Sequence, residues 1–78
     1  MEISHLSLSE IPAGKKARIH RLLSKPDVSH RLRELGFLEN AVVRCVVNGE
    51  GNLIFEVCNT RIGLNHSVAQ TIKVSRFE

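Results

Sequence analysis

The sequence consists of short segments rich in β-branched residues, each closed by a turn, and this pattern limits the fold more than any other feature. Gly, Asn and Pro, which favour turns, stand between many of these segments. Short segments of this kind, bounded by turn residues, predict β-strands. The predicted strands cover residues 16–22, 41–47, 53–57, 61–64 and 71–74.

Five short strands in 78 residues would expose unpaired backbone edges if the sheet stayed open. Closure of the sheet into a small barrel removes those edges. We therefore predict a mainly β fold, a five-stranded SH3-like barrel with one short α-helix over one end and a further helical turn. A chain of this length supplies one core, so residues 1–78 are expected to form a single domain.

The α-helix is predicted after the first strand, where apolar residues at positions i, i+4 and i+7 form one helical face. These residues are Val28, Leu32 and Leu35. Pro26 or Asp27 is typical of the start of such a helix, and Gly36 of its end. We expect Leu32 and Leu35 to lie in the core. The helix is short, so packing on the sheet must stabilise it.

Three details of the second half of the chain are also predicted. Asn65 is expected to cap the helical turn that ends at Gln70, because its side chain can accept free amide hydrogens. In the strand at residues 41–47, alternation places Val43, Cys45 and Val47 on the inward side. The turn at residues 58–60 is expected to join two strands into a hairpin.

The two cysteines and the N-terminus bear on the cellular compartment. Met1 and the residues after it lack the positive start and apolar core of a signal peptide. No apolar run approaches the ~20 residues that a membrane-spanning helix needs. We therefore expect a cytoplasmic protein in which Cys45 and Cys58 are buried thiols and form no disulfide.

Positive charge is concentrated in one part of the chain, whose formal net charge is +3. Between Lys15 and Arg33 seven basic residues stand against one acid, Asp27. Such a stripe is typical of a solvated face that keeps a small protein in solution. It is also suited to phosphate or to an acidic protein, and both interpretations stay open.

Several motifs occur in the order and spacing of one known family. They are Leu8 with Gly14, then Arg-Leu-Arg-Glu-Leu-Gly-Phe at 31–37, Gly-Asn-Leu at 51–53, Ile-Gly-Leu at 62–64 and Ile-Lys-Val at 72–74. Together they resemble the FeoA family from about residue 6 to residue 74. The chain has Glu39-Asn40 where the family usually has Pro-Gly, and Gly51-Asn52 where it often has Gly-Pro. Asn is also a turn residue, so the barrel is still expected.

This resemblance implies a small cytoplasmic SH3-like domain that acts with FeoB, the bacterial ferrous-iron transporter with a cytoplasmic GTPase domain. We therefore expect a non-enzymatic accessory protein that docks on the cytoplasmic part of a FeoB-type transporter. Similar domains occur at the C-terminal end of iron-responsive repressors. The alternative is accordingly a small basic module that binds nucleic acid or senses metal.

The residue types present in the chain argue against several functions. No Ser/His/Asp or Cys/His arrangement and no paired carboxylates stand out, so the sequence predicts no enzyme and no cofactor. The only aromatic residues are Phe37, Phe55 and Phe77, which disfavours the stacking that single-stranded nucleic acid needs and the aromatic groove that proline-rich peptides need.

Metal ligands are present, but they are scattered. The candidates are His5, His20, His30, His66, Cys45 and Cys58. None of them stands in the close pairs that are typical of a structural zinc site. A weak or transient Fe²⁺ site stays open, since imidazole and carboxylate suit that ion.

The helix and the segment that follows it are the first candidate surface for a protein partner. An exposed Phe37 or Leu38 beside Arg31 and Arg33 would suit a partner with apolar and acidic patches. The alternative is that Phe37 fills the end of the barrel. A second candidate is the loop with Gly49 and Gly51, because glycine lets another backbone approach closely. Weak self-association stays open.

Overall fold

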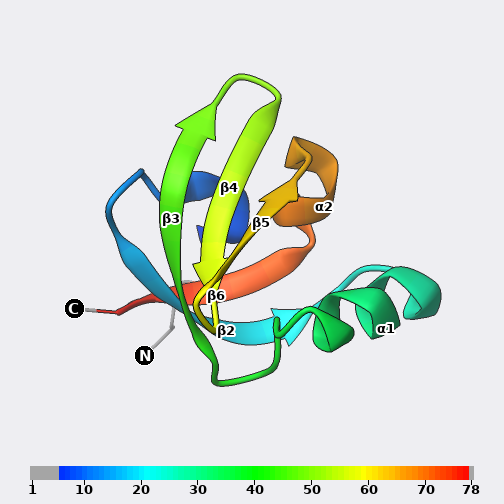
Figure 1. Ribbon diagram of the computed structural model, residues 1–78. Coiled ribbons are helices and arrows are strands. Elements are labelled where there is room, and N and C mark those ends of the chain that lie inside the picture. Colours follow the sequence, from blue (N-terminus) through cyan, green and yellow to red (C-terminus); the bar gives the residue numbers. More distant parts are fainter. Residues whose placement is uncertain (1–5, 78) are drawn as a thin grey trace, which may run out of the picture.

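Six strands form one antiparallel sheet in the computed structural model, which describes residues 6–77 (Figure 1). The order in the sheet is β1-β6-β2-β3-β4-β5, so β1 and β5 are its edges. The mainly β prediction is confirmed, with six strands instead of five. The strands are β1 (Leu6–Ser7), β2 (Lys16–Leu22), β3 (Val42–Gly49), β4 (Asn52–Val57), β5 (Thr60–Leu64) and β6 (Ile72–Phe77).

β1 is the strand that sequence reasoning missed. It has two residues and pairs only with β6, in the register Leu6 to Val74 and Ser7 to Lys73. A 3₁₀ helix, η1 (Leu8–Glu10), follows directly. The Glu10 carboxylate accepts hydrogen bonds from the Ser7 backbone N–H at 2.9 Å and from the Ser7 Oγ at 3.1 Å. These bonds bend the chain out of the sheet after two residues.

The core lies on the concave side of the curled sheet and draws on nearly every element. In β2 and β4 the buried residues alternate with more exposed ones. The buried apolar residues are Leu8, Ile11, Ala17, Ile19, Leu32, Phe37, Val43, Cys45, Leu53, Phe55, Val57, Ala69, Ile72 and Val74. Such a core carries most of the stabilisation that a sheet of short strands requires.

Alternation fails in β3, where Val47 was predicted to point inward. Val43 and Cys45 are buried, but Val47 is 40% exposed. The register passes from Cys45 opposite Phe55 to Val47 opposite Ile54, so Val46 is an extra residue. A β-bulge of this kind shifts the inward and outward positions by one residue, and the inward prediction for Val47 is wrong.

Helix α1 (Pro26–Glu34) begins and ends where the sequence predicts, and it projects from the sheet (Figure 1). Leu32 is buried in the core, but Leu35 is 42% exposed, so its predicted burial is wrong. The helix ends at Glu34, and Gly36 turns the chain with a φ of +110°. That turn carries Phe37 into the core in place of Leu35.

The second helical segment and the last hairpin also follow the sequence. Helix α2 (His66–Gln70) is capped by Asn65, whose Oδ1 accepts from the Val68 backbone N–H at 2.8 Å. β4 and β5 form the predicted hairpin. Cys58 lies in its turn with a φ of +51° and is exposed, so its predicted burial is wrong, whereas Cys45 is a buried free thiol. No helix within residues 6–77 is long and apolar enough to cross a membrane.

Candidate docking surface

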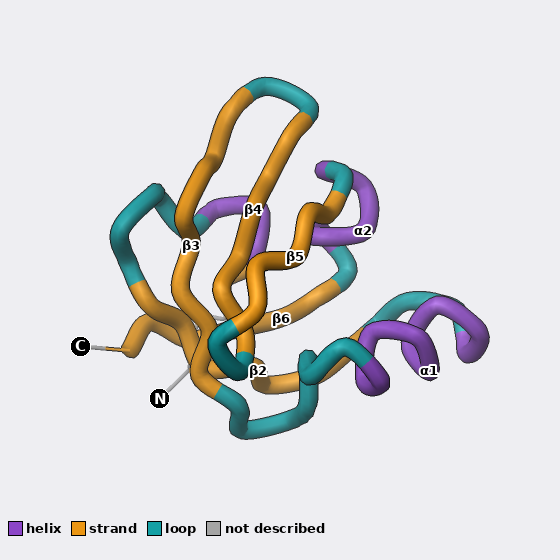
Figure 2. The backbone as a smooth tube through the Cα atoms, viewed as in Figure 1, coloured by secondary structure: helices purple, strands orange, loops and turns teal. Residues whose placement is uncertain are grey.

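A groove of about 350 Å³ lies between α1, the edge strand β5 and helix α2. The tube in Figure 2 places these three elements on the same side of the molecule. The groove is lined by Asp27, Val28, Arg31, Leu32, Leu35, Gly63, Leu64 and Val68. Most of these residues are apolar, and only Leu32 among them is fully buried, so the groove offers apolar surface to solvent.

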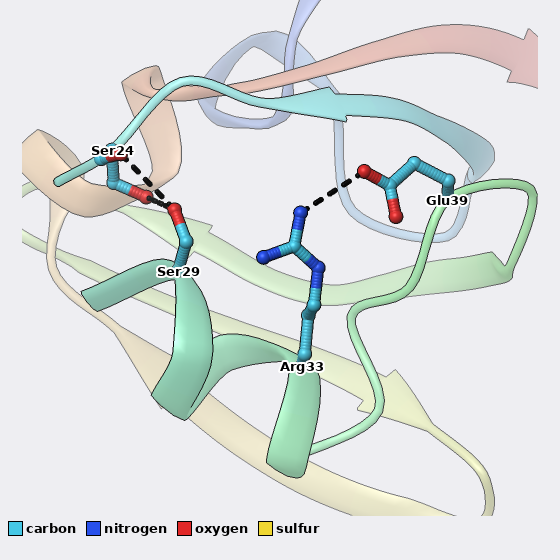
Figure 3. A network of polar contacts seen from close by, with 4 residues as sticks. All are labelled: Ser24, Ser29, Arg33 and Glu39. Atoms are coloured by element: carbon cyan, nitrogen blue, oxygen red, sulfur yellow. Dashed lines mark hydrogen bonds and ion pairs between the residues drawn. The ribbon is translucent and has the colours of Figure 1, made fainter. Parts of the chain in front are cut away.

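The wall formed by α1 is held at both of its ends (Figure 3). Before the helix, the Ser29 Oγ donates to the Ser24 carbonyl at 3.1 Å and lies 3.0 Å from the Ser24 Oγ. After it, the Arg33 guanidinium donates to Glu39 at 3.1 Å. A hydrogen bond from its own backbone N–H, and then the bond from Arg33, lowers the pKa of Glu39. These contacts fix a short helix that few core residues anchor.

The charges around the groove are unevenly matched. Arg31 is exposed, and no salt bridge in residues 6–77 includes it. Asp27 accepts a hydrogen bond from the Val28 backbone N–H at 2.9 Å, at the start of the helix. His30 lies 3.2 Å from Glu34 on the solvent side. Arg31 is therefore the cation of the groove that remains available to an acidic group.

The predicted docking residues of the helix region fall into two sets. Arg31 borders the groove and Leu38 is 48% exposed, whereas Phe37 is fully buried. Of the two interpretations of Phe37, an exposed docking residue or a core residue, the second is therefore correct. Arg33 is partly occupied by Glu39. Arg31 keeps its place at the candidate surface, while Phe37 belongs to the core.

Gly49 and Gly51 do not join this surface. Gly49 ends β3, and Gly51 lies in the loop to β4 with a φ of +72°. That loop lies at the end of the sheet remote from α1 (Figure 1). The two predicted docking regions are thus separate, and the groove described above lies on the helix side.

The candidate metal ligands that the structure describes do not gather into a metal-binding group. Within residues 6–77 no group of three or more His, Cys, Asp or Glu side chains could hold a metal ion, and His5 lies outside the described residues. Burial raises the pKa of the Cys45 thiol, which donates a hydrogen bond to the Val47 carbonyl at 3.5 Å. Cys45 therefore serves as a neutral, apolar side chain of the core.

Comparison with known families decides where this fold belongs. The FeoA domain family matches residues 6–76, which is nearly the whole chain. The chain belongs to the FeoA family. Members of this family are linked to ferrous iron transport. A search of curated proteins found no relative.

Solved structures agree with the FeoA assignment. FeoA from Stenotrophomonas maltophilia, complexed with zinc, is 36% identical with a TM-score of 0.74, and the match covers 90% of this chain and 89% of that one. It is described as a prokaryotic SH3 domain protein and as a candidate activating factor of ferrous iron transport. An iron uptake regulatory protein, also FeoA, is 20% identical with a TM-score of 0.87, covering 95% of this chain and 100% of that one.

A manganese-dependent transcriptional repressor shares the fold as well. It is 16% identical with a TM-score of 0.88, and the match covers 97% of this chain but 43% of the repressor. Identity this low shows the fold alone. In the Glu39-Asn40 turn, Asn40 adopts a φ of +74°, a left-handed conformation that asparagine tolerates.

Sequence reasoning missed the β5 side of the groove. Gly63 lies inside the strand between Ile62 and Leu64, and a glycine inside a strand often marks a site where another backbone approaches. That signal was present in the sequence. The sequence did not reveal that α1 lies opposite Gly63. Helical periodicity identifies the apolar face of a helix, but it does not identify the element that packs against that face.

Proposed function

We propose that this FeoA protein is a non-enzymatic, cytoplasmic accessory protein of bacterial ferrous-iron uptake. It docks on the cytoplasmic, GTPase-containing part of a FeoB-type transporter and alters the nucleotide cycle or the assembly of that transporter. The observation that carries this proposal is the family match over residues 6–76. The FeoA protein from Stenotrophomonas, described as a candidate activating factor of ferrous iron transport, supports it.

The geometry supports docking through the groove between α1, β5 and α2. Leu35 is 42% exposed on one wall, with half-buried Leu64 and Val68 opposite. Exposed apolar residues beside a charged residue are typical of the centre and rim of a protein interface. Arg31 gives this groove a cationic rim that suits an acidic partner surface.

The alternative of a nucleic-acid-binding module has less support. Phe37 and Phe55 are buried, and Phe77 is half-buried with the Arg18 guanidinium 5.2 Å from its ring centre. Proteins that bind single strands without sequence preference usually expose aromatic rings for the bases. The basic residues of β2 are better interpreted as a solvated face.

Titration of the full chain against the purified cytoplasmic part of a FeoB-type transporter tests the proposal. It is to be done with GTP, with GDP and without nucleotide, and repeated with transporter in membranes. We expect saturable binding that Arg31→Glu weakens. Arg76→Glu, which makes the same charge change at an exposed site on β6, is the matched control. Absence of binding under all these conditions would refute the docking proposal.

A further inference from the structure

Within residues 6–77, no strand pairs with the outer edge of β5. β5 pairs with β4 on one side, and it is the last strand of the sheet. Within residues 6–77, the backbone hydrogen bonds made outside helices and strand pairs include none from residues 60–64. An exposed strand edge is a template on which another extended chain can pair.

The hairpin turn determines which groups of β5 point to that edge. Cys58 and Asn59 form a two-residue loop with φ values of +51° and +64°, and Val57 lies opposite Thr60. In such a hairpin the flanking residues form a hydrogen-bonded pair, and such pairs alternate along the ladder. Thr60, Ile62 and Leu64 therefore bond to β4. The N–H and C=O groups of Arg61 and Gly63 point to the open edge.

The groove meets this edge at Gly63. Gly63 and Leu64 form one wall, and α1 forms the other. Gly63 is exposed and carries no side chain, so it leaves its own backbone accessible to another chain. A strand edge facing a helix across an apolar groove is the arrangement that binds peptides by strand addition, with pockets for alternate side chains.

The charges favour an acidic occupant. Arg31 lies in the groove and Arg61 is exposed on β5, and neither forms a salt bridge within residues 6–77. Asp27 also lines the groove and keeps its negative charge, since its carboxylate only accepts a hydrogen bond from the Val28 backbone N–H. The two cations Arg31 and Arg61 therefore stand against one carboxylate of the lining, and Glu34 lies beside His30. A carboxylate of an incoming chain would thus find a cation without displacing an existing pair.

We propose that an extended segment of the partner protein adds to β5 as a further strand of the sheet. Its main chain bonds to Arg61 and Gly63, one apolar side chain enters the groove between Leu35 and Leu64, and a carboxylate lies near Arg31. This inference rests on the docking function proposed above and specifies its mode. The partner segment is recognised mainly through its backbone, so the groove selects an apolar and acidic pattern more than a fixed sequence.

Amide hydrogen exchange of the full chain, free and bound to the cytoplasmic part of a FeoB-type transporter, tests the mode directly. In the free protein the Arg61 and Gly63 amides should exchange fast, while those of Ile62 and Leu64 are protected by β4. In the complex the Arg61 and Gly63 amides should become protected. Binding without any new protection at these two amides would overturn strand addition and leave the docking function intact.

Two substitutions at one position separate the backbone from the side chain. Gly63→Pro removes the outward N–H, and proline is tolerated at the open side of an edge strand. Gly63→Ala keeps the N–H, and the added Cβ would come no closer than 3.8 Å to the Leu53 carbonyl oxygen. We expect Gly63→Pro to weaken binding by about tenfold or more, since a hydrogen bond is lost and the ring obstructs the edge. Gly63→Ala should bind within about threefold of the unchanged protein.

Thermal melts of both variants verify that the fold is intact. Equal binding of the two folded variants would overturn strand addition. If the Pro variant does not fold, the amide exchange pattern decides alone. Failure of the unchanged chain to bind the transporter would overturn both the docking function and this inference. Sedimentation at rising concentration distinguishes a second copy, because a dimer that Gly63→Pro abolishes would assign the edge to self-pairing instead.

Discussion

The two edges of the sheet are built in opposite ways. β1 has two residues and turns at once into η1, where Ser7 and Glu10 hold the bend. β5 has five residues, and three of them are exposed. A very short edge strand protects a sheet from pairing with another chain, whereas a longer open one invites it. The comparison indicates that one edge serves stability and the other is available for binding.

The side chains at the β1 edge are also packed more tightly into the core than those at the β5 edge. Leu8 and Ile11, which follow β1, are fully buried in the core. Ile62 and Leu64 of β5 are only partly buried and pack against the outside of that core. Substitutions near β1 should therefore affect folding, and substitutions on β5 should chiefly affect binding.

The largest effect is expected from truncating the core residue beside β1. Leu8→Ala should lower the free energy of unfolding by about 2–5 kcal/mol, because a fully buried leucine leaves a cavity. Leu64→Ala on β5 should cost about 1–2 kcal/mol, since its side chain keeps contact with solvent. Urea denaturation measures both. Equal losses would mean that the two edges are packed alike, against the comparison.

A somewhat smaller loss is expected at Gly36, which positions α1 as the far wall of the groove. A Cβ there would lie 2.8 Å from Val57 Cγ1, and the φ of +110° is unfavourable for alanine. Gly36→Ala should destabilise the protein by about 1–3 kcal/mol from overpacking, with backbone strain added. Gly14→Ala is the control, because Gly14 also has a positive φ of +90° but has nothing within 4 Å of an added Cβ. Denaturation curves that do not distinguish the two variants would contradict the close contact with Val57.

Loss of the Ser7 hydroxyl tests the same difference in stability between the β1 and β5 edges, with a smaller expected effect. Ser7→Ala removes a hydrogen bond to Glu10 beside the short edge and should cost about 0.5–1.5 kcal/mol. Thr60→Ala on the exposed edge should change stability by less than about 0.5 kcal/mol. Thermal unfolding followed by circular dichroism suffices for both. A larger loss at Thr60 would reverse the assignment of the stabilising edge.

The smallest effect is a pH dependence located at β1. Hydrogen bonds from the Ser7 backbone and then its side chain lower the pKa of Glu10. A carboxyl with a lowered pKa stabilises the fold above its unfolded-state pKa, and that contribution is lost as pH falls through the folded-state value. Glu10→Gln should therefore flatten part of the loss of melting temperature in acid, whereas Glu50→Gln in the β3–β4 loop controls for the charge. An unchanged acid profile would show that the Ser7–Glu10 bonds do not persist in solution.

Sequence patterns predicted those parts of the fold whose structure is determined locally. Short segments bounded by turn residues located β2 and β4, and Pro26 and Gly36 marked the two ends of α1. Leu35 was assigned to the core because it continues the helical period, but the helix ends one residue before it. The prediction for Val47 failed for a similar reason. Strict alternation of inward and outward residues does not account for the extra residue that the bulge at Val46 inserts.

The candidate site was only partly predictable. Arg31 could be found from the charge of the helix, but the groove depends on where α1 lies relative to β5, two elements separated by more than twenty residues. Periodicity describes one element at a time and gives no distance between two. What the sequence patterns lack is the tertiary arrangement, above all the position of α1 relative to the open edge of β5.

The place of β6 in the sheet has a consequence for how the chain is made. Although it is the last strand in sequence, it lies in the interior of the sheet between β1 and β2. During synthesis, β1 and β2 cannot pair with β6 until Phe77 has emerged from the ribosome. Folding is therefore expected to be concerted and late, because the decisive contacts join residues far apart in the chain. A nascent chain stalled before Ile72 would lack the strand that pairs with Ala17 and Ile19, and this unpaired strand edge would favour aggregation until translation resumes.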